Sequence, residues 1–220
     1  MKDSISGVGT LDKAVRVLEA LAPEPLSLAG LVEATRLSRP TAHRLARALE
    51  AHRLVRRDPE GSFALGLRLS TLGQSALEAV PIAAIALPAL EQLRDATGES
   101  VQLYVRDGER RLCVAALESP HGLRTIVDVG AALPLDVGSA GRVLGGGGDG
   151  AGPSWTESVG ERQAGVASAS APVRDADDSV IAAVSVSGPI ERTSHQPGRR
   201  YGRALLRAAR RIERDTRFEH

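Results

Sequence analysis

The spacing of apolar residues changes near Gly98, and this change constrains the fold more than any other feature of the sequence. Before Gly98, apolar residues mostly recur every three or four positions; after it, they mostly recur every two. The first spacing is typical of amphipathic helices and the second of β-strands. A chain of 220 residues is long enough for two small domains. The sequence therefore predicts an α+β protein with a helical N-terminal part and a strand-rich C-terminal part.

The first 66 residues contain the order helix, helix, turn, helix and hairpin. Helical spacing predicts helices over 11–21 and 27–35 and a third helix over 38–50, with Ser27 and Ser38 as N-caps. Apolar residues expected to face inward are Leu11, Ala14, Val15, Leu18 and Leu21 on the first helix and Ala42, Leu45, Ala48 and Leu49 on the third. Strands at 54–57 and 62–65 flank the turn AspProGluGly. This order predicts a winged helix-turn-helix domain over residues 1–66.

Positive charge concentrates in the same region. The net charge is +1 for the whole chain, but eight arginines and only three acidic residues lie between Arg36 and Arg68. A helix of about 13 residues is roughly 20 Å long and fits the major groove of duplex DNA. We expect the DNA-contacting residues to be Ser38, Arg39, Thr41, His43, Arg44 and Arg47 on the third helix and Arg56 and Arg57 on the hairpin. The competing interpretation is a merely solvated basic face, which arginine-rich proteins often show.

The remainder of the chain is predicted to be a connector followed by a second domain. Helical spacing continues over 67–80, and a further helix from Pro88 to Thr97 is expected to end at Gly98. Alternating segments at 100–106 and 111–117, and again at 165–173 and 179–188, predict two hairpins. A basic helix is expected from Arg200 to Arg217, with Leu205, Ala208, Ala209 and Ile212 on one face. The predicted second domain covers 81–220, and the glycine-rich stretch 145–153 is expected to be a loop.

Several other classes of function are disfavoured. Aromatic residues make up 2% of the chain, which argues against binding single strands by base stacking. The single cysteine, Cys113, excludes an internal disulfide, and the five dispersed histidines provide no metal-ligand pair. Residues 145–150 match GxGxxG but no apolar helix follows them. The N-terminus lacks an apolar signal core. We expect a cytoplasmic protein that is not an enzyme, with no catalytic residues, no metal site and no cofactor.

The whole pattern resembles the IclR family of bacterial transcription regulators. The N-terminal half carries the resemblance in VGTLDKAVRVLEAL, LSLAGLVEATRLSRPTAHRLARALEAHRLVRRD and FALGLRLSTLG. The C-terminal half carries it in TGESVQLYVRDGERRLCVAALES, LRTIVDVGAALPLDVGSAGRVL and GERQAGVASASAPVRDADDSVIAAVSVSGPIER. The resemblance covers nearly the whole chain. Within the family, the sequence looks similar to NdgR-type actinobacterial regulators, which implies control of amino-acid metabolism genes of the leucine type.

The resemblance implies a GAF- or PAS-like effector-binding domain in the C-terminal half. The family's ligand-contacting positions match Ser139 and Ala140 in GSAGR, Ser168, Ser185 and Ser187 on the central strands, and Ser158 or Glu157 on the entering segment. The implied ligand is a small metabolite such as an amino acid or a 2-oxo acid. The family also implies a homodimer or tetramer that binds a pseudo-palindromic operator in double-stranded DNA. Family members have a longer segment where this chain has its glycine-rich stretch.

Some alternatives remain open at this point. The sequence does not distinguish a repressor from an activator, or a dimer from a tetramer. A GAF-like small-molecule-binding or enzymatic module without specific DNA binding is the alternative to a DNA-binding regulator.

Overall fold

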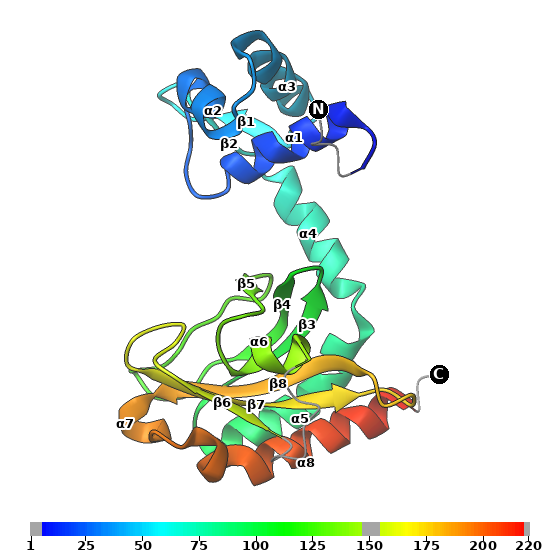
Figure 1. Ribbon diagram of the computed structural model, residues 1–220, viewed down its shortest axis with the longest axis vertical. Coiled ribbons are helices and arrows are strands. Elements are labelled where there is room, and N and C mark those ends of the chain that lie inside the picture. Colours follow the sequence, from blue (N-terminus) through cyan, green and yellow to red (C-terminus); the bar gives the residue numbers. More distant parts are fainter. Residues whose placement is uncertain (1–5, 147–154, 218–220) are drawn as a thin grey trace. The chain divides into compact units, whose positions relative to one another are not determined.

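The computed structural model describes residues 6–146 and 155–217 (Figure 1). The chain divides into two compact units, Met1–Ala76 and Leu77–His220, and each is considered on its own. The first unit is a helix-turn-helix domain with a small hairpin, and the second is built on a curled antiparallel sheet. The α+β class predicted from apolar spacing is confirmed.

The first unit contains three short helices followed by a two-stranded hairpin. They are α1 (Gly9–Ala20), α2 (Leu28–Thr35), α3 (Arg39–Ala51), β1 (Val55–Arg57) and β2 (Phe63–Leu65). β1 pairs antiparallel with β2, so the hairpin has the form of a wing. Helix α4 (Arg68–Glu78) runs from the end of this unit into the second.

The core of the first unit differs from the predicted inward faces at three positions. Leu11 and Val15 are exposed, and the buried residue on α1 is Val17. On α3, Ala48 was expected to face inward but is exposed, whereas Ala46 is buried. Ala46 follows Ala42 by one helical turn and so shares its buried side. The prediction for Ala48 was therefore wrong.

The two predicted helix caps have different outcomes. The Ser27 side chain accepts a hydrogen bond from the Gly30 amide at 3.2 Å, which confirms its capping role. Ser38 occupies the N-cap position of α3, but its side chain bonds no backbone amide. Instead, Ser38 Oγ donates to Thr41 Oγ1 at 2.9 Å. The helix start was predicted correctly, while the capping bond was not.

The second unit is a six-stranded antiparallel sheet with strand order β5-β4-β3-β8-β7-β6. Its strands are β3 (Ser100–Asp107), β4 (Arg110–Leu117), β5 (Ala132–Pro134), β6 (Thr156–Val159), β7 (Val166–Arg174) and β8 (Val180–Pro189). Its helices are α5 (Pro81–Thr97), α6 (Ser139–Leu144), α7 (Ile190–Thr193) and α8 (Pro197–Arg217). Helices α5 and α8 cover one face of the sheet, and α6 lies over the other (Figure 1).

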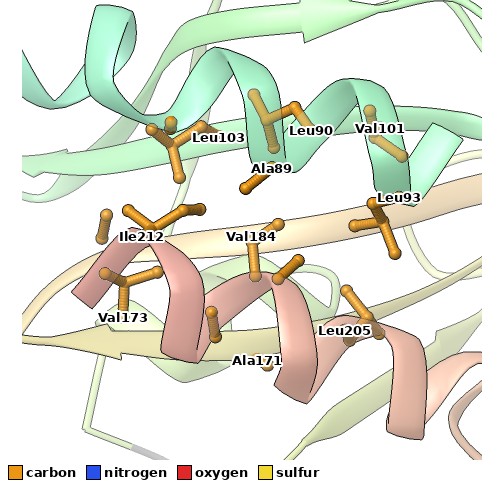
Figure 2. Packing of buried hydrophobic residues seen from close by; sticks show 14 of the residues in the cluster. Ala89, Leu90, Leu93, Val101, Leu103, Ala171, Val173, Val184, Leu205 and Ile212 are labelled. Carbon is orange, nitrogen blue, oxygen red and sulfur yellow. The ribbon is translucent and has the colours of Figure 1, made fainter. Parts of the chain in front are cut away.

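The face covered by α5 and α8 forms the main core. Figure 2 shows Leu90 and Leu93 of α5 facing Leu205 and Ile212 of α8, with branched strand residues such as Val184 between them. All of these side chains are buried. The predicted inward stripe of α8 is confirmed, because Leu205, Ala208, Ala209 and Ile212 all lie in this core.

Both predicted hairpins are confirmed as β3–β4 and β7–β8. The predicted start of α5 at Pro88 was wrong: the helix begins at Pro81 and contains Pro88. Proline is well placed in the first turn, and the interior Pro88 gives up one backbone bond in a helix held by its apolar packing. Most of the predicted glycine-rich loop, residues 147–153, lies outside the described residues.

Within the described residues, no single helix is long and apolar enough to span a bilayer, and α4 and α5 meet those criteria only when taken together across the break between them.

Candidate DNA interface and effector cavity

The outward face of α3 carries most of the predicted DNA-contacting residues. Arg39, His43, Arg44 and Arg47 are exposed, and Thr41 is half-buried. The opposite face is anchored by its buried alanines and leucines in the core of the first unit. Tight packing on one side therefore presents a row of cationic and polar groups on the other. The N-terminus of such a helix also favours a phosphate group near Ser38.

Three of these arginines have no protein partner within residues 6–146 and 155–217. Arg39 and Arg44 on α3 and Arg56 on β1 make no ion pair or side-chain hydrogen bond among the residues that the structure describes. Arg47 differs, because its Nη1 lies 3.4 Å from Glu50 Oε2. Unpaired guanidinium groups keep their full hydrogen-bonding capacity for bases and phosphates.

The two wing arginines point to different environments. Neighbouring residues of a strand point to opposite sides, so the side chains of Arg56 and Arg57 leave the strand in opposite directions. The Arg57 guanidinium carbon lies 4.1 Å from the centre of the Phe63 ring, and its Nη1 donates to Gly61 O at 2.7 Å. Its Nε also lies 3.5 Å from Glu50 Oε1. Arg57 is therefore tied to the wing by internal contacts while its side chain stays 38% exposed, whereas Arg56 makes no such contact among the described residues.

A row of hydroxyl groups lines the face of the second sheet that lies opposite the main core. The register places Ser168 beside Ser187 and Ser170 beside Ser185 on β7 and β8. Gln102 of β3 lies next to Ser185. Because side chains alternate along a strand, these residues all face α6.

The hydroxyl groups are joined by hydrogen bonds. Ser139 Oγ lies 2.7 Å from Ser168 Oγ and 2.8 Å from Ser170 Oγ. Ser170 Oγ donates to Ser185 Oγ at 2.9 Å, and Ser187 Oγ donates to Gln102 Oε1 at 3.1 Å. The buried hydroxyls are thus satisfied by one another and by the Gln102 amide oxygen, as burial requires.

A cavity of about 30 Å³ adjoins this network. Its lining consists of Gln102, Tyr104, Arg111, Gly138, Ser139, Ala140, Ser158, Arg162, Gln163, Val166, Ser168, Ser185 and Ser187. The volume corresponds to about two water molecules.

Six of the seven predicted effector residues meet at this cavity. Ser139 and Ala140 contribute from the first turn of α6, and Ser158, Ser168, Ser185 and Ser187 contribute from the strands. Glu157 is not among them. It neighbours Ser158 on β6 and so faces the other side of the sheet, where its Oε2 accepts a hydrogen bond from the Gly198 amide of α8 at 2.8 Å.

Sequence reasoning missed the charged part of the lining. Arg111 is only 3% exposed, and its Nη1 donates to the carbonyl oxygens of Pro134 and Val137. Burial lowers the pKa of Arg111, although an arginine still remains protonated. Its guanidinium carbon lies 5.5 Å from the centre of the Tyr104 ring, and burial raises the pKa of that phenol. Gln102 and Tyr104 could have been recognised as polar residues that alternate on one strand.

The described residues include no group of three or more histidine, cysteine or acidic side chains that could hold a metal ion. Cys113 is fully buried beside the cavity wall, and burial raises the pKa of its thiol to about 12. Such a thiol carries very little thiolate at neutral pH and is a poor nucleophile.

Comparison with family models covers both units. The model described as the IclR helix-turn-helix domain matches residues 10–59. The model described as the bacterial transcriptional regulator IclR C-terminal domain matches residues 74–146 and 152–214. Both models describe transcription regulators rather than enzymes.

Individual relatives and structures agree with these matches. The chain is 31% identical over 136 residues to the transcriptional regulator KipR of Bacillus subtilis, an alignment covering 61% of this chain and 54% of KipR. It therefore spans about half the length of that relative. It is 29% identical to the glycerol operon regulatory protein of Streptomyces griseus, over 84% of this chain and 86% of that protein.

A solved structure shares the fold. It is an IclR homologue from Microbacterium hydrocarbonoxydans in complex with 4-hydroxybenzoate, with a TM-score of 0.74 at 23% identity over 94% of this chain and 99% of that one.

Proposed function

This chain belongs to the IclR family of bacterial transcription regulators, and we propose that it binds a pseudo-palindromic DNA operator and responds to a small-molecule effector. The observation that carries the DNA half is the outward face of α3, a helix of 13 residues on which the exposed Arg39 and Arg44 have no partner in the described part of the protein. A helix of this length fits the major groove.

The proposed DNA contacts divide into two kinds. Arg39 and Arg44 read base edges, helped by Thr41, His43 and Arg47, while Ser38 lies against a phosphate at the start of α3. Arg56 neutralises phosphates from the wing, and Arg57 holds the wing in shape. Base contacts carry sequence specificity, whereas phosphate contacts add affinity for any duplex.

The effector half of the proposal places the ligand in the cavity between α6 and the serine-lined face of the sheet. Ser139, Ala140, Ser158, Ser168, Ser185 and Ser187 are the proposed contacts. Hydroxyl groups both donate and accept hydrogen bonds, which suits a small polar metabolite. The complex of the Microbacterium homologue with 4-hydroxybenzoate supports a small-molecule effector.

The proposal includes assembly as a homodimer or a tetramer. A regulator with twofold symmetry reads two half-sites, which explains a pseudo-palindromic operator. Val8, Leu11 and Val15 form an exposed apolar stripe at the start of the chain, and covering this stripe gives a physical reason for self-association.

Finer assignments extend the proposal. We place the protein in the cytoplasm, where its DNA is, and in the NdgR-type subgroup. Its targets would then be genes of amino-acid metabolism, of the leucine type. These assignments are supported by the resemblance of the segments quoted above.

The test of DNA binding uses a duplex selected by the full chain from a randomised library. Fluorescence anisotropy then compares this operator with a scrambled duplex across a series of salt concentrations. We expect tighter operator binding and an affinity that falls steeply with salt. Equal affinities for both duplexes would refute the regulator and favour a GAF-like module that does not bind specific DNA.

A further inference from the structure

The effector cavity carries an imbalance of charge. Its lining includes two cationic side chains, Arg111 and Arg162, and no aspartate or glutamate among the residues that the structure describes. Glu161 is nearby, but its carboxylate is already engaged by Arg142 at 2.6 Å, by the Gly138 amide at 3.1 Å and by the Ser158 hydroxyl. The positive charge of the cavity therefore lacks a carboxylate partner within the described part of the protein.

Arg111 is the buried member of the two cations. Its Nη1 is occupied by backbone carbonyls, but its Nε is buried and has no hydrogen-bond partner. Nη2 also has no partner among the described residues. Among the described residues, no carboxylate pairs with Arg111, although Asp136 attracts it from further away. A buried cation with free donors is costly unless an anion compensates it.

We propose that Arg111 binds the carboxylate of the effector and that the cavity selects an organic acid bearing oxygen at C2 over the corresponding amino acid. The inference rests on the proposed function only in placing the effector in this cavity. A guanidinium group offers two parallel donors to a carboxylate, and Nε with Nη2 forms one such pair. Ser185, Ser187 and Gln102 then face the rest of the ligand.

The same lining disfavours an ammonium group. An amino acid would bring a third cation close to Arg111 and Arg162, and the described lining offers no acidic side chain to receive it. An oxo or hydroxyl oxygen at that place instead meets hydroxyls that can donate or accept.

The ligand must also make room for itself. A cavity of about 30 Å³ is smaller than a three-carbon acid. Arg162 and Gln163 are exposed parts of the lining, so these two side chains can move aside at low cost. Arg111 is fixed by its backbone contacts and remains in place as the recognition group.

The test is isothermal titration calorimetry on the full chain with matched ligands. Two series are used: pyruvate, lactate, alanine and lactamide, and 4-methyl-2-oxopentanoate, leucine and leucinamide. We expect the oxo and hydroxy acids to bind at least tenfold more tightly than the amino acid or the amide of the same skeleton. The variant R111Q should weaken acid binding by about 10- to 100-fold, the usual effect of a hydrogen bond to a charged group. R111K should weaken it less, because it keeps the charge but loses the paired donors.

The matched control is R110Q, which removes the same charge from the adjacent exposed position and should leave acid binding unchanged. Operator affinity and thermal unfolding of each variant report whether it folds. If R111Q fails to fold, the ligand series and R111K still decide the question.

Two adverse outcomes are distinguishable. Equal or tighter binding of the amino acid or amide, or unchanged acid binding by folded R111Q, would overturn the role of Arg111 while leaving the effector cavity in place. Binding of no ligand in either series would overturn the inference together with the effector half of the proposed function. The operator measurement tests the DNA half independently.

Discussion

Replacing Arg44 with alanine separates base reading from general attraction to DNA. Arg44 is exposed on α3 and has no partner among the residues that the structure describes, so its truncation is expected to leave no buried group unsatisfied and to disturb no ion pair. The whole effect should therefore come from the lost DNA contact. A side chain that reads a base typically contributes about 1 to 3 kcal/mol, which is roughly a 5- to 150-fold loss of operator affinity.

Arg56 provides the contrasting variant. It is also exposed and makes no ion pair or side-chain hydrogen bond in the described part of the chain, but it lies on the wing, where it is expected to meet phosphate. R56A should weaken the operator and a scrambled duplex by the same factor. It should also reduce the slope of log affinity against log salt by about 0.9, the contribution of one phosphate contact.

Arg57 completes the comparison as a structural control. Its contacts with Phe63 and Glu50 predict that R57A lowers the free energy of unfolding by about 1 kcal/mol, combining a cation–π contact with an exposed ion pair. Its effect on DNA affinity should be small. The assays are anisotropy titration on both duplexes and urea unfolding of each variant. If R44A lowered affinity for the operator and the scrambled duplex equally, the assignment of Arg44 to base reading would be refuted.

Three further predictions concern the second unit. L205A should lower the free energy of unfolding by about 2 to 5 kcal/mol in a urea titration, because the side chain is fully buried between α8 and the sheet. G198A should destabilise by about 1 to 3 kcal/mol, since an added Cβ would lie 2.4 Å from Trp155 Nε1; a melting temperature equal to that of the unaltered chain would contradict this packing. Cys113 should resist labelling by a disulfide reagent at pH 8 until the protein unfolds, because its thiol pKa of about 12 lies far above that pH and the sulfur is buried; rapid labelling of native protein would disprove its burial.

The helix-turn-helix unit was largely predictable because its signals are local. Helical spacing, a capping serine and a turn sequence each act within a few residues, and together they located α1, α2, α3 and the wing. The errors arose where spacing alone cannot choose a side. Ala46 and Ala48 are chemically identical, and only the contact of α3 with its neighbours decides which one is buried.

The cavity was predictable in part, for a different reason. Its serines alternate along β7 and β8, so their common face follows from strand geometry. The contacts of Arg57 and Glu157 could not be predicted in this way, since Phe63, Glu50 and Gly198 reach them through tertiary structure.

Arg111 shows most clearly why the sequence was insufficient. Ala116 of β4 pairs with Gln102, which faces the cavity. If side chains alternated regularly along β4, every second residue before Ala116 would face the cavity too. These residues are Val114, Leu112 and Arg110. The register instead shifts at this point: Leu103 pairs with Ala115, and Tyr104 pairs with Cys113. Val114 is therefore left without a partner on β3 and forms a bulge.

This bulge turns Val114 into the main core and brings Arg111, rather than Arg110, into the cavity. Bulges that redirect a side chain are common beside binding sites. One extra residue in a strand pairing thus decides which of two adjacent arginines supplies the buried charge. R111Q and R110Q make the same arginine-to-glutamine change at neighbouring positions. Because of the bulge, they are expected to differ in ligand binding.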